Sequence, residues 1–534
     1  MPNPPVGVLI IGAGASGAAF AWSMAGTGAS ILCLEQGPWM HQKDYPSNNL
    51  DWESRALGPF ATSPNVRALP YDYPLNERDS DISPLMYNAV GGSTILWAAH
   101  FPRLKPSDFR VHTDDGVADD WPVDYETLDP YFAVNDRIMG VSGLAGDPSY
   151  PYHEPPLPPL PLGRSGNRMA AGFEKLGWHW WPSESAINSR EHQGRAACIN
   201  LGPCTSGCTQ GARASTDITY WPLAQRKGVQ LRTGCRVREI TVRPDGMADG
   251  VLYYDEDGVL QEQKAEVVVL AANGIGTPRL LLNSKSQQHP EGLANSSGLV
   301  GKNLMFHPCA SVSAIFDEPL GGRAGPVGCA FWSHEFYNTD PARGFVRGYG
   351  FQARRGLPPA QTALWGMARG NIPWGESHHD AYARMYDRNA GLLVIGEDLP
   401  EETNTVTLDP TLTDSHGIPA PKVTYRLSEN SRRMLDHGIE RAQEVLTAAG
   451  AVETFADPLL RGAGWHLLGT ARMGTDPKTS VVNEWGRAHD VKNLFIIDGS
   501  IFVTAGAVNP TSTIQALALF IADRIKQNMA TLFD

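Results

Sequence analysis

The 534-residue sequence lacks an excess of positive charge, a rich set of cysteines and any long apolar run. It has 44 Lys and Arg against 57 Asp and Glu, and this formal net charge of −13 disfavours binding to nucleic acid or to an anionic membrane surface. No uninterrupted apolar stretch is long enough for a membrane-spanning helix. Seven cysteines, an odd number, do not suggest a secreted disulfide framework. We therefore expect no nucleic-acid partner and no transmembrane segment.

The sequence also lacks solenoid-type internal repeats, and no basic segment precedes its first apolar run. We therefore expect no signal peptide, and we predict a cytoplasmic location. Export to the periplasm together with a signal-bearing partner is the alternative. A hydrophobic content of 42% with 19% charged residues is typical of a soluble globular protein. The chain is too long for one ordinary core, which predicts two closely joined domains.

The first motif is an apolar run, Val6–Ile11, that leads directly into the glycine-rich segment Gly12-Ala13-Gly14-Ala15-Ser16-Gly17. This pattern predicts a buried strand, a tight turn and the start of a helix. In such a motif Gly12 allows the turn, Gly14 lets a diphosphate approach the backbone, and Gly17 lets the helix pack closely on the strand. The free N–H groups at the helix N-terminus would then face the phosphates.

A second apolar run, Ile31–Leu34, ends at Glu35, about 20 residues beyond the glycines, where a carboxylate can hold a ribose hydroxyl. A glycine-rich turn without a ligand is the alternative. Because strands flank the turn and an acidic residue ends the second strand, we favour a dinucleotide site.

The predicted fold class is α/β, or α+β overall. Buried strands near residues 10, 270 and 495 are expected to share one sheet, so the nucleotide-binding domain is predicted to be discontinuous. Its segments are 1–45, 80–150, 190–310 and 460–534. Alternating strands, including one over 405–408, and a helix near 431–449 predict an inserted substrate-binding domain over 311–459, an antiparallel sheet backed by helices. A helix is also predicted over Thr277–Asn283, with Pro278 in its first turn.

Two stretches show little periodicity. Residues 46–79 are rich in Pro, Asn, Asp and aromatic residues, which predicts a surface excursion that serves as a lid or a subunit contact. Residues 151–189 are predicted to link the domains, because they begin with the polyproline-like segment 153–162.

Taken together, several motifs in a fixed order resemble the glucose–methanol–choline (GMC) oxidoreductases, nearest to the glucose and gluconate dehydrogenase and pyranose oxidase branch. The matching segments are Gly12–Gly17 with Glu35, Gly91-Gly92-Ser93, Trp121-Pro122, Ala271–Gly274, Gly301–Leu304 with His307-Pro308, His466–Gly474, and Asp498–Ser500 with Asn509–Thr511. The resemblance implies a Rossmann-like domain that binds FAD, a choice that the glycine motif alone cannot make.

The resemblance also implies which residues contact FAD. The ADP half would lie on the glycine motif and Glu35, the backbone of Val237 would meet the adenine, and Asp498 would lie near the ribityl and diphosphate portion. Pyranose oxidases attach FAD through a histidine just after the paired glycines. This chain has Leu96 at that position, so we expect non-covalent FAD. The predicted cofactor-binding set is Gly12, Gly14, Ala15, Ser16, Gly17, Glu35, Gly91, Gly92, Ser93, Val237, Ala272, Asp498, Gly499, Asn509, Pro510 and Thr511.

Oxidising an alcohol removes a hydride from carbon and a proton from oxygen, so the protein must supply a base beside the flavin. His466 has the place in the family motif that implies this role, and Asn509 at the paired position would orient the substrate oxygen. A helix N-cap is a compatible second role for Asn509. His307 is expected to be structural, and Trp465 to pack around the flavin or line the pocket.

Three cysteines, Cys198, Cys204 and Cys208, follow a C-x5-C-x3-C spacing in a loop rich in Gly, Pro and Thr. Three thiolates can hold a [3Fe–4S] cluster. The loop resembles that of FAD-dependent glucose dehydrogenase catalytic subunits, where such a cluster passes electrons to a haem subunit, which implies an electron-transfer partner here. A disulfide with one thiol, three reduced thiols, or a zinc site that lacks a ligand are the alternatives.

The predicted function is FAD-dependent oxidation of an alcohol group, with a sugar, glycoside or polyol as the substrate. Oxidation of hydrophobic primary alcohols, long-chain or aromatic, is the alternative within the enzyme class. A flavin-binding homologue without turnover is the alternative from another class, and the presence of both His466 and Asn509 argues against it.

Overall fold

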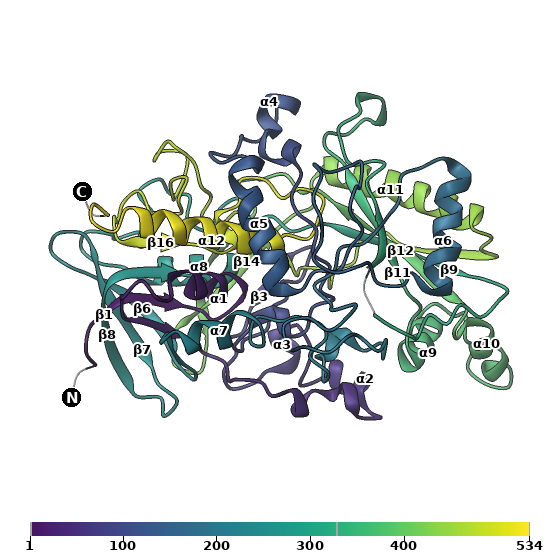
Figure 1. Ribbon diagram of the computed structural model, residues 1–534, viewed down its shortest axis with the longest axis horizontal. Coiled ribbons are helices and arrows are strands. Elements are labelled where there is room, and N and C mark those ends of the chain that lie inside the picture. Colours follow the sequence, from purple (N-terminus) through teal and green to yellow (C-terminus); the bar gives the residue numbers. More distant parts are fainter. Residues whose placement is uncertain (1–2, 327–328, 533–534) are drawn as a thin grey trace.

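The computed structural model describes residues 3–326 and 329–532 and has two lobes (Figure 1). Both chain ends lie in the lobe that contains β1, β8 and β16, whereas α6, α9, α10 and α11 lie in the other lobe. The two ends of the sequence therefore build one half of the molecule together, as the discontinuous domain requires.

The first lobe is organised around a seven-stranded sheet. At its centre β1 (Val6–Ile11) lies between β2 (Ile31–Leu34) and β8 (Leu260–Leu270), all parallel. The last three residues of β8 pair with β16 (Leu494–Ile496), which confirms that the three predicted strands share one sheet. These strands are nearly continuous apolar runs because both faces of a parallel sheet are buried. The remaining strands are β5 (Gln230–Arg232), parallel to β2, and β6 (Arg236–Val242) with β7 (Ala248–Tyr254), antiparallel beside the first half of β8.

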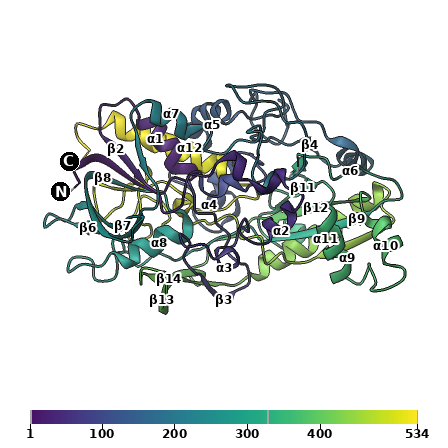
Figure 2. The same cartoon turned by 90° about the horizontal axis from the view of Figure 1, so that it is seen from below.

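Helices cover both faces of this sheet. Helix α1 (Ala15–Met24) follows β1, and the chain then enters β2 on one side of β1. Helix α8 (Asn273–Asn283) follows β8, and the chain later returns to β16, which lies on the opposite side of β8 from β1. Because parallel crossovers are right-handed, α1 and α8 lie on opposite faces (Figure 2). Three further helices lie on the α1 side, namely α5 (Tyr125–Met139), α7 (Tyr220–Arg226) and α12 (Thr511–Gln527).

Helix α8 begins four residues before the predicted start at Thr277, so Pro278 lies inside the helix and not in its first turn. A proline in that position removes the N–H that would bond the Gly274 carbonyl. The Thr470 hydroxyl donates to this carbonyl instead, at 2.8 Å. A contact from a distant segment thus makes an interior proline tolerable, which local sequence rules could not indicate.

The second lobe contains a six-stranded antiparallel sheet in the order β15-β9-β12-β11-β10-β4. Its strands are β15 (Glu453–Asp457), β9 (Cys309–Ile315), β12 (Asn389–Gly396), β11 (Tyr349–Arg354), β10 (Cys329–Ser333) and β4 (Trp181–Pro182). Helices α11 (Glu429–Ala448) and α6 (Gly163–Leu176) back one face around a core that includes Phe173, Val312 and Phe351. The predicted antiparallel sheet backed by helices is therefore present.

Two predicted assignments differ from the structure. The stretch predicted as a linker, 151–189, contributes α6 and β4 to the second lobe. The buried face of α6 carries Met169, Ala170 and Phe173 at helical spacing, a pattern that the interpretation as a linker overlooked. The strand predicted at 405–408 belongs not to the large sheet but to a separate three-stranded sheet of β13 (Thr405–Thr413), β14 (Pro419–Tyr425) and β3 (Asn76–Ser80). The last of these strands comes from the predicted surface excursion.

The remaining helices are short. They are α2 (Trp52–Ala56), α3 (Pro64–Arg67), α4 (Val111–Asp115), α9 (Pro359–Ala368) and α10 (His378–Met385), with 3-10 turns at Gln42–Asp44, Pro46–Asn48, Gly92–Ile95, Pro106–Phe109, Cys204–Ser206, Pro341–Arg343 and Gly499–Ile501. Within the described ranges, no helix combines the length and the apolar character that crossing a bilayer demands.

A buried ion cluster joins the lobes. The Arg347 guanidinium donates to Asp108, Asp115 and Glu397 at 2.7–2.8 Å, and all four side chains are buried or nearly so. The Tyr337 hydroxyl donates to Asp108 at 2.7 Å and accepts from the Ala507 N–H at 3.0 Å. The cluster thereby fixes the loop that precedes α12.

Replacing Arg347 with Met should leave three buried carboxylates without their common cation and lower the free energy of unfolding by about 3–5 kcal/mol. Urea denaturation measures this loss. Arg384→Met is the control, because Arg384 is exposed and lies 3.5 Å from Glu453, so it should change stability by less than about 1 kcal/mol. Equal effects of both substitutions would contradict the proposed importance of the cluster.

Candidate active site

A cavity of about 1100 Å³ lies between the two lobes and is lined from both. Glycine-rich turns and the start of α12 line it from the first lobe, and strands β9, β11 and β12 line it from the second. Ligand pockets usually measure about 300–1,000 Å³, so this cavity has room for a ligand larger than an ordinary substrate.

The turn between β1 and α1 forms one end of the cavity. Gly12 has a φ of +103°, and a Cβ added at Gly17 would lie 2.1 Å from the Gly12 carbonyl oxygen. A Cβ at Gly14 would meet nothing within 4 Å, because Gly14 faces the cavity with Ala15 and Ser16. The N-terminus of α1 has no side-chain cap and no acidic residue in its first turn. Its N–H groups are therefore available to an anionic group in the cavity.

Glu35 braces this glycine turn. Its carboxylate accepts hydrogen bonds from the Ala13 and Gly37 N–H groups, both at 2.8 Å, and burial raises the pKa of Glu35 to about 7. Glu35 also lines the cavity, as the predicted ribose contact requires. That contact remains a prediction, since the carboxylate is engaged with the backbone on the side of the turn.

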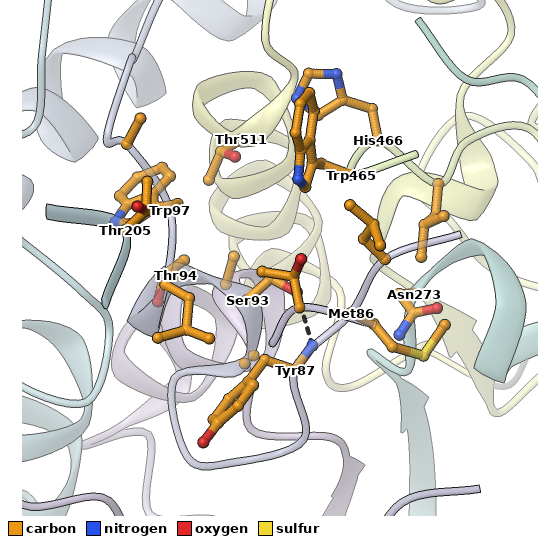
Figure 3. A pocket seen from close by; sticks show the side chains of 18 of the residues that line it. Met86, Tyr87, Ser93, Thr94, Trp97, Thr205, Asn273, Trp465, His466 and Thr511 are labelled. Carbon is orange, nitrogen blue, oxygen red and sulfur yellow. Dashed lines mark hydrogen bonds between the residues drawn. The ribbon is translucent and has the colours of Figure 1, made fainter. Parts of the chain in front are cut away.

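The paired glycines pack against the same turn. Gly91 has a φ of +99° and donates its N–H to the Ala13 carbonyl at 2.9 Å, and a Cβ at Gly92 would lie 3.0 Å from Gly14 Cα. The Ser93 hydroxyl accepts a hydrogen bond from the Tyr87 N–H at 3.2 Å, shown as the dashed line in Figure 3. Small residues here are explained by the close approach of two backbones.

Asp498 connects the ends of β16 and β8 to α8. Its carboxylate accepts from the Thr277 hydroxyl at 2.6 Å, the Ser500 N–H at 2.9 Å and the Asn273 N–H at 3.2 Å, and burial raises its pKa. Of the predicted cofactor-binding residues, those that line the cavity are Gly12, Gly14, Ala15, Ser16, Glu35, Gly92, Ser93, Val237, Ala272, Asp498, Gly499, Asn509, Pro510 and Thr511. Gly17 and Gly91 lie behind this lining and permit its close packing.

His466 and Asn509 meet at the other end of the cavity. Asn509 Nδ2 lies 3.3 Å from His466 Nε2, and Asn509 Oδ1 accepts a hydrogen bond of 2.6 Å from Gln352 Nε2 of β11. Figure 3 shows His466 beside Trp465, close to Thr511 at the start of α12. The predicted pair is thus brought together from segments 43 residues apart.

A second histidine sets the tautomer of His466. His307 Nε2 lies 2.7 Å from the Gly506 carbonyl oxygen, so this nitrogen carries the proton of the neutral ring. His307 Nδ1 is then an acceptor, and His466 Nδ1, at 2.9 Å, must donate to it. His466 Nε2 is left without a proton and presents its lone pair to Asn509 and the cavity. His307, expected to be only structural, therefore orients the predicted base.

Both imidazoles are neutral near pH 7. Burial lowers the pKa of His307 to about 4. The pKa of His466 is lowered well below 6.5 by burial, and next by the nearby His307 and His100. A neutral His466 can accept a proton, which is the state that a general base needs.

Helix α12 begins at Thr511, after Pro510, and its N-terminus has no side-chain cap. Thr511 and Ile514 of this helix line the cavity. The Asn509 side chain bonds His466 and Gln352 and does not cap the helix, contrary to the second role considered for it. A second uncapped helix N-terminus therefore faces the cavity.

Comparisons with known proteins agree with this geometry. Two GMC oxidoreductase family models match residues 158–309 and 400–518, and a model of the NAD(P)-binding Rossmann-like domain matches residues 10–70. The chain is 44% identical to 2-methyl-1,2-propanediol dehydrogenase of Mycolicibacterium austroafricanum over 99% of this chain and 96% of that protein. The chain belongs to the GMC oxidoreductase family.

Other GMC relatives share nearly the full length. Identity is 30% to the fructose dehydrogenase large subunit of Gluconobacter japonicus and to paromamine 6'-oxidase of Streptomyces fradiae, each over 98% of this chain and over 98% and 92% of those proteins. Among solved structures, pyridoxine 4-oxidase from Mesorbium loti matches with a TM-score of 0.66 at 16% identity, over 97% of this chain and 98% of that one, and supports the fold.

The GMC family is FAD-dependent, and the residues of this cavity fit FAD. The uncapped N-terminus of α1 and the open space at Gly14 suit a diphosphate, and a second uncapped helix N-terminus faces the same cavity. Leu96 lines the cavity and offers no atom for covalent attachment, so non-covalent binding stays our prediction.

The interpretation of the cysteine loop as a [3Fe–4S] site is not supported. Among the described residues, no group of three His, Cys, Asp or Glu side chains could hold a metal ion. Cys198 Sγ instead accepts a hydrogen bond from the Asn200 N–H at 3.4 Å, and Cys204 lies in a 3-10 turn. Spacing along a loop does not determine whether the thiols converge.

Sequence reasoning missed Gln352, which bonds Asn509. A signal was available in β11, where polar Gln352 and Arg354 alternate with apolar Phe351 and Ala353. Alternation in a strand places the two polar residues on one face, opposite the core. On the neighbouring strand β10, by contrast, Phe331 and Trp332 are buried and pack into the interior.

Two glycine substitutions should separate packing from cofactor binding. Gly17→Ala places a Cβ against the Gly12 carbonyl, so it should destabilise the protein with or without FAD. Gly14→Ala meets no protein atom, so the apoprotein should keep its Tm but bind FAD more weakly. Thermal melting and flavin absorbance per mole of protein measure the two effects. Full flavin content in the Gly14→Ala protein would contradict the diphosphate cradle.

Proposed function

We propose that this protein oxidises a CH–OH group of a sugar, glycoside or polyol, including short diols, with His466 as the general base. The observation that carries the proposal is the unprotonated Nε2 of His466, directed at Asn509 and the cavity by its bond to His307. The names of the relatives support the substrate class, since a branched diol, a ketose and an aminoglycoside fragment are all polyhydroxylated.

FAD bound along the cavity would supply the acceptor for the hydride that leaves the carbinol carbon. His466 Nε2 takes the hydroxyl proton, so the carbinol loses two electrons and two hydrogens in all and becomes a carbonyl. Asn509 has no basic nitrogen, and its Nδ2 donates a hydrogen bond to the substrate oxygen. Gln352 holds Asn509 in this orientation through Oδ1. His307 keeps the proton on His466 Nδ1, which leaves Nε2 as the site that accepts the new one.

The alternatives differ in what supports them. A homologue without turnover is disfavoured because a non-catalytic protein needs no oriented, neutral histidine in its cavity. Hydrophobic primary alcohols remain the second candidate, because Trp465, Leu393 and Ile395 line the same cavity. An electron-transfer partner subunit also remains a proposal, supported by the name of the fructose dehydrogenase large subunit.

Replacing His466 with Gln should slow flavin reduction by substrate about 10²–10⁴-fold, because the amide cannot accept the hydroxyl proton. The purified variant should stay yellow. Anaerobic bleaching by a panel of sugars, polyols and alcohols measures the rate. The control is His41→Gln, at an exposed position outside the cavity, which should reduce as fast as the wild type. Undiminished reduction in the His466→Gln protein would refute the assignment of the base.

The rate of flavin reduction should show no inflection near pH 6.5. Because the pKa of His466 is lowered well below 6.5, the neutral base is present at neutral pH and is lost only as the pH falls through that lowered value.

His307→Leu should reduce kcat on the order of 10²-fold with little change in KM, because Nδ1 of His466 loses its acceptor. His307→Gln should restore part of the rate, since an amide oxygen can accept from Nδ1. Similar losses in the two variants would indicate a packing role only.

A further inference from the structure

Arg354, the last residue of β11, lies near the proposed base and has no part in the mechanism above. Gln352 and Arg354 are two residues apart on one strand, so their side chains lie on the same face, about 7 Å apart along the strand. Both line the cavity. Gln352 bonds Asn509, so Arg354 is one step further from the reacting hydroxyl along the wall of the second lobe.

The guanidinium of Arg354 is poorly satisfied by the protein. Within residues 3–326 and 329–532, its hydrogen bond goes to the Ser311 hydroxyl at 3.4 Å, and no carboxylate lies within ion-pairing distance. The acidic neighbour, Asp457, pairs with Arg369 instead. A guanidinium has five N–H donors, so most of those of Arg354 have no acceptor among the residues that the structure describes. Burial lowers the pKa of Arg354, which reflects the cost of a cation in this place.

The surroundings do not supply the missing anion. The groups closest in electrostatic terms are the Cys309 thiol on β9 and Asp457 on β15. Arg323 and Arg461 also line the cavity, and they add positive charge to its wall although the whole chain carries a net charge of −13. Gly391 lies opposite Arg354 on β12 and contributes no side chain that could cover the guanidinium.

Apolar side chains separate this cation from the base. Leu393 pairs with Gln352 in the sheet, and Leu393 and Cys309 line the cavity. The wall therefore presents, in order, a hydrogen-bonding group that holds Asn509, a short apolar surface and a cation. A molecule with a hydroxyl at one end, a few carbons in the middle and an anion at the other end matches this order.

We infer that Arg354 binds a carboxylate of the substrate, so that the preferred alcohols of this enzyme are hydroxy acids or polyol carboxylates. The inference rests on the proposed function and adds a carboxylate to the alcohol that this site binds. A carboxylate fits because its two oxygens match the planar fork of one guanidinium. The pair positions the hydroxyl at His466, and it takes part in no bond-breaking step.

The direct test uses an inert ligand. The FAD-loaded protein is titrated with butyrate and with its neutral amide, butyramide, and binding is followed by the change in flavin absorbance. Wild type should bind butyrate, and Arg354→Gln should weaken that binding by about 30-fold or more, with butyramide unaffected. Arg354→Lys should retain part of the affinity. Arg384→Gln, at an exposed position on α10, is the matched control and should bind butyrate as the wild type does.

The kinetic test compares 4-hydroxybutyrate with 1-butanol, which share four carbons and a primary hydroxyl. Arg354→Gln should raise KM for 4-hydroxybutyrate by about 30-fold or more and change KM for 1-butanol by less than about threefold. If butyrate and butyramide bind alike in wild type and variant, the inference is wrong, even where alcohols reduce the flavin through His466. If butyrate binding depends on Arg354 but no alcohol reduces the flavin, the anion site stands and the proposed function fails.

Discussion

The structure depends on three parallel strands, β1, β8 and β16, that end at the same edge of one sheet. In such sheets the carboxyl ends of the strands are where ligands bind. Here that edge carries the turn to α1 and the loop to α12, and both helices present uncapped N-termini to one cavity. Gln515 of α12 donates to the Ala15 carbonyl at 3.4 Å, so the two ends of the chain are in direct contact.

The second lobe completes the site, because two of its residues form hydrogen bonds with His466 and Asn509 of the first lobe. His307 lies two residues before β9, and Gln352 lies within β11, so the large antiparallel sheet fixes the orientation of both His466 and Asn509. The Gly506 carbonyl, which sets the tautomer of His307, lies in a loop held by Tyr337 and the ion cluster. Chemistry at the cavity therefore requires correct docking of the lobes, and each lobe alone would carry half of the hydrogen-bonded chain.

Local patterns predicted much of this arrangement. The glycine motif and the buried strands follow from short segments whose backbone needs are visible in the sequence, whereas the pairing of His466 with Asn509 was implied by the resemblance to the GMC family. Several of the misses depend on contacts or loop conformations that a local pattern does not encode. The hydroxyl of Thr470 makes Pro278 tolerable inside α8, pairing with β14 takes the strand at 405–408 out of the large sheet, and convergence of Cys198, Cys204 and Cys208 depends on loop conformation. The contact of His307 with His466 was missed for the same reason.

The late position of β16 in the chain has a consequence for biosynthesis. Ribosomes add about 5–20 residues per second, so roughly 11–45 s separate the synthesis of Leu270, at the end of β8, from that of Leu494. During that interval the second half of β8 has an unpaired edge, a feature that promotes association between nascent chains. A message cut short before β16 would yield a polypeptide with an open sheet and no closed cavity. The last strand of this domain is made nearly at the end of synthesis. We therefore expect chaperones to bind the chain during this interval and incomplete chains to be degraded.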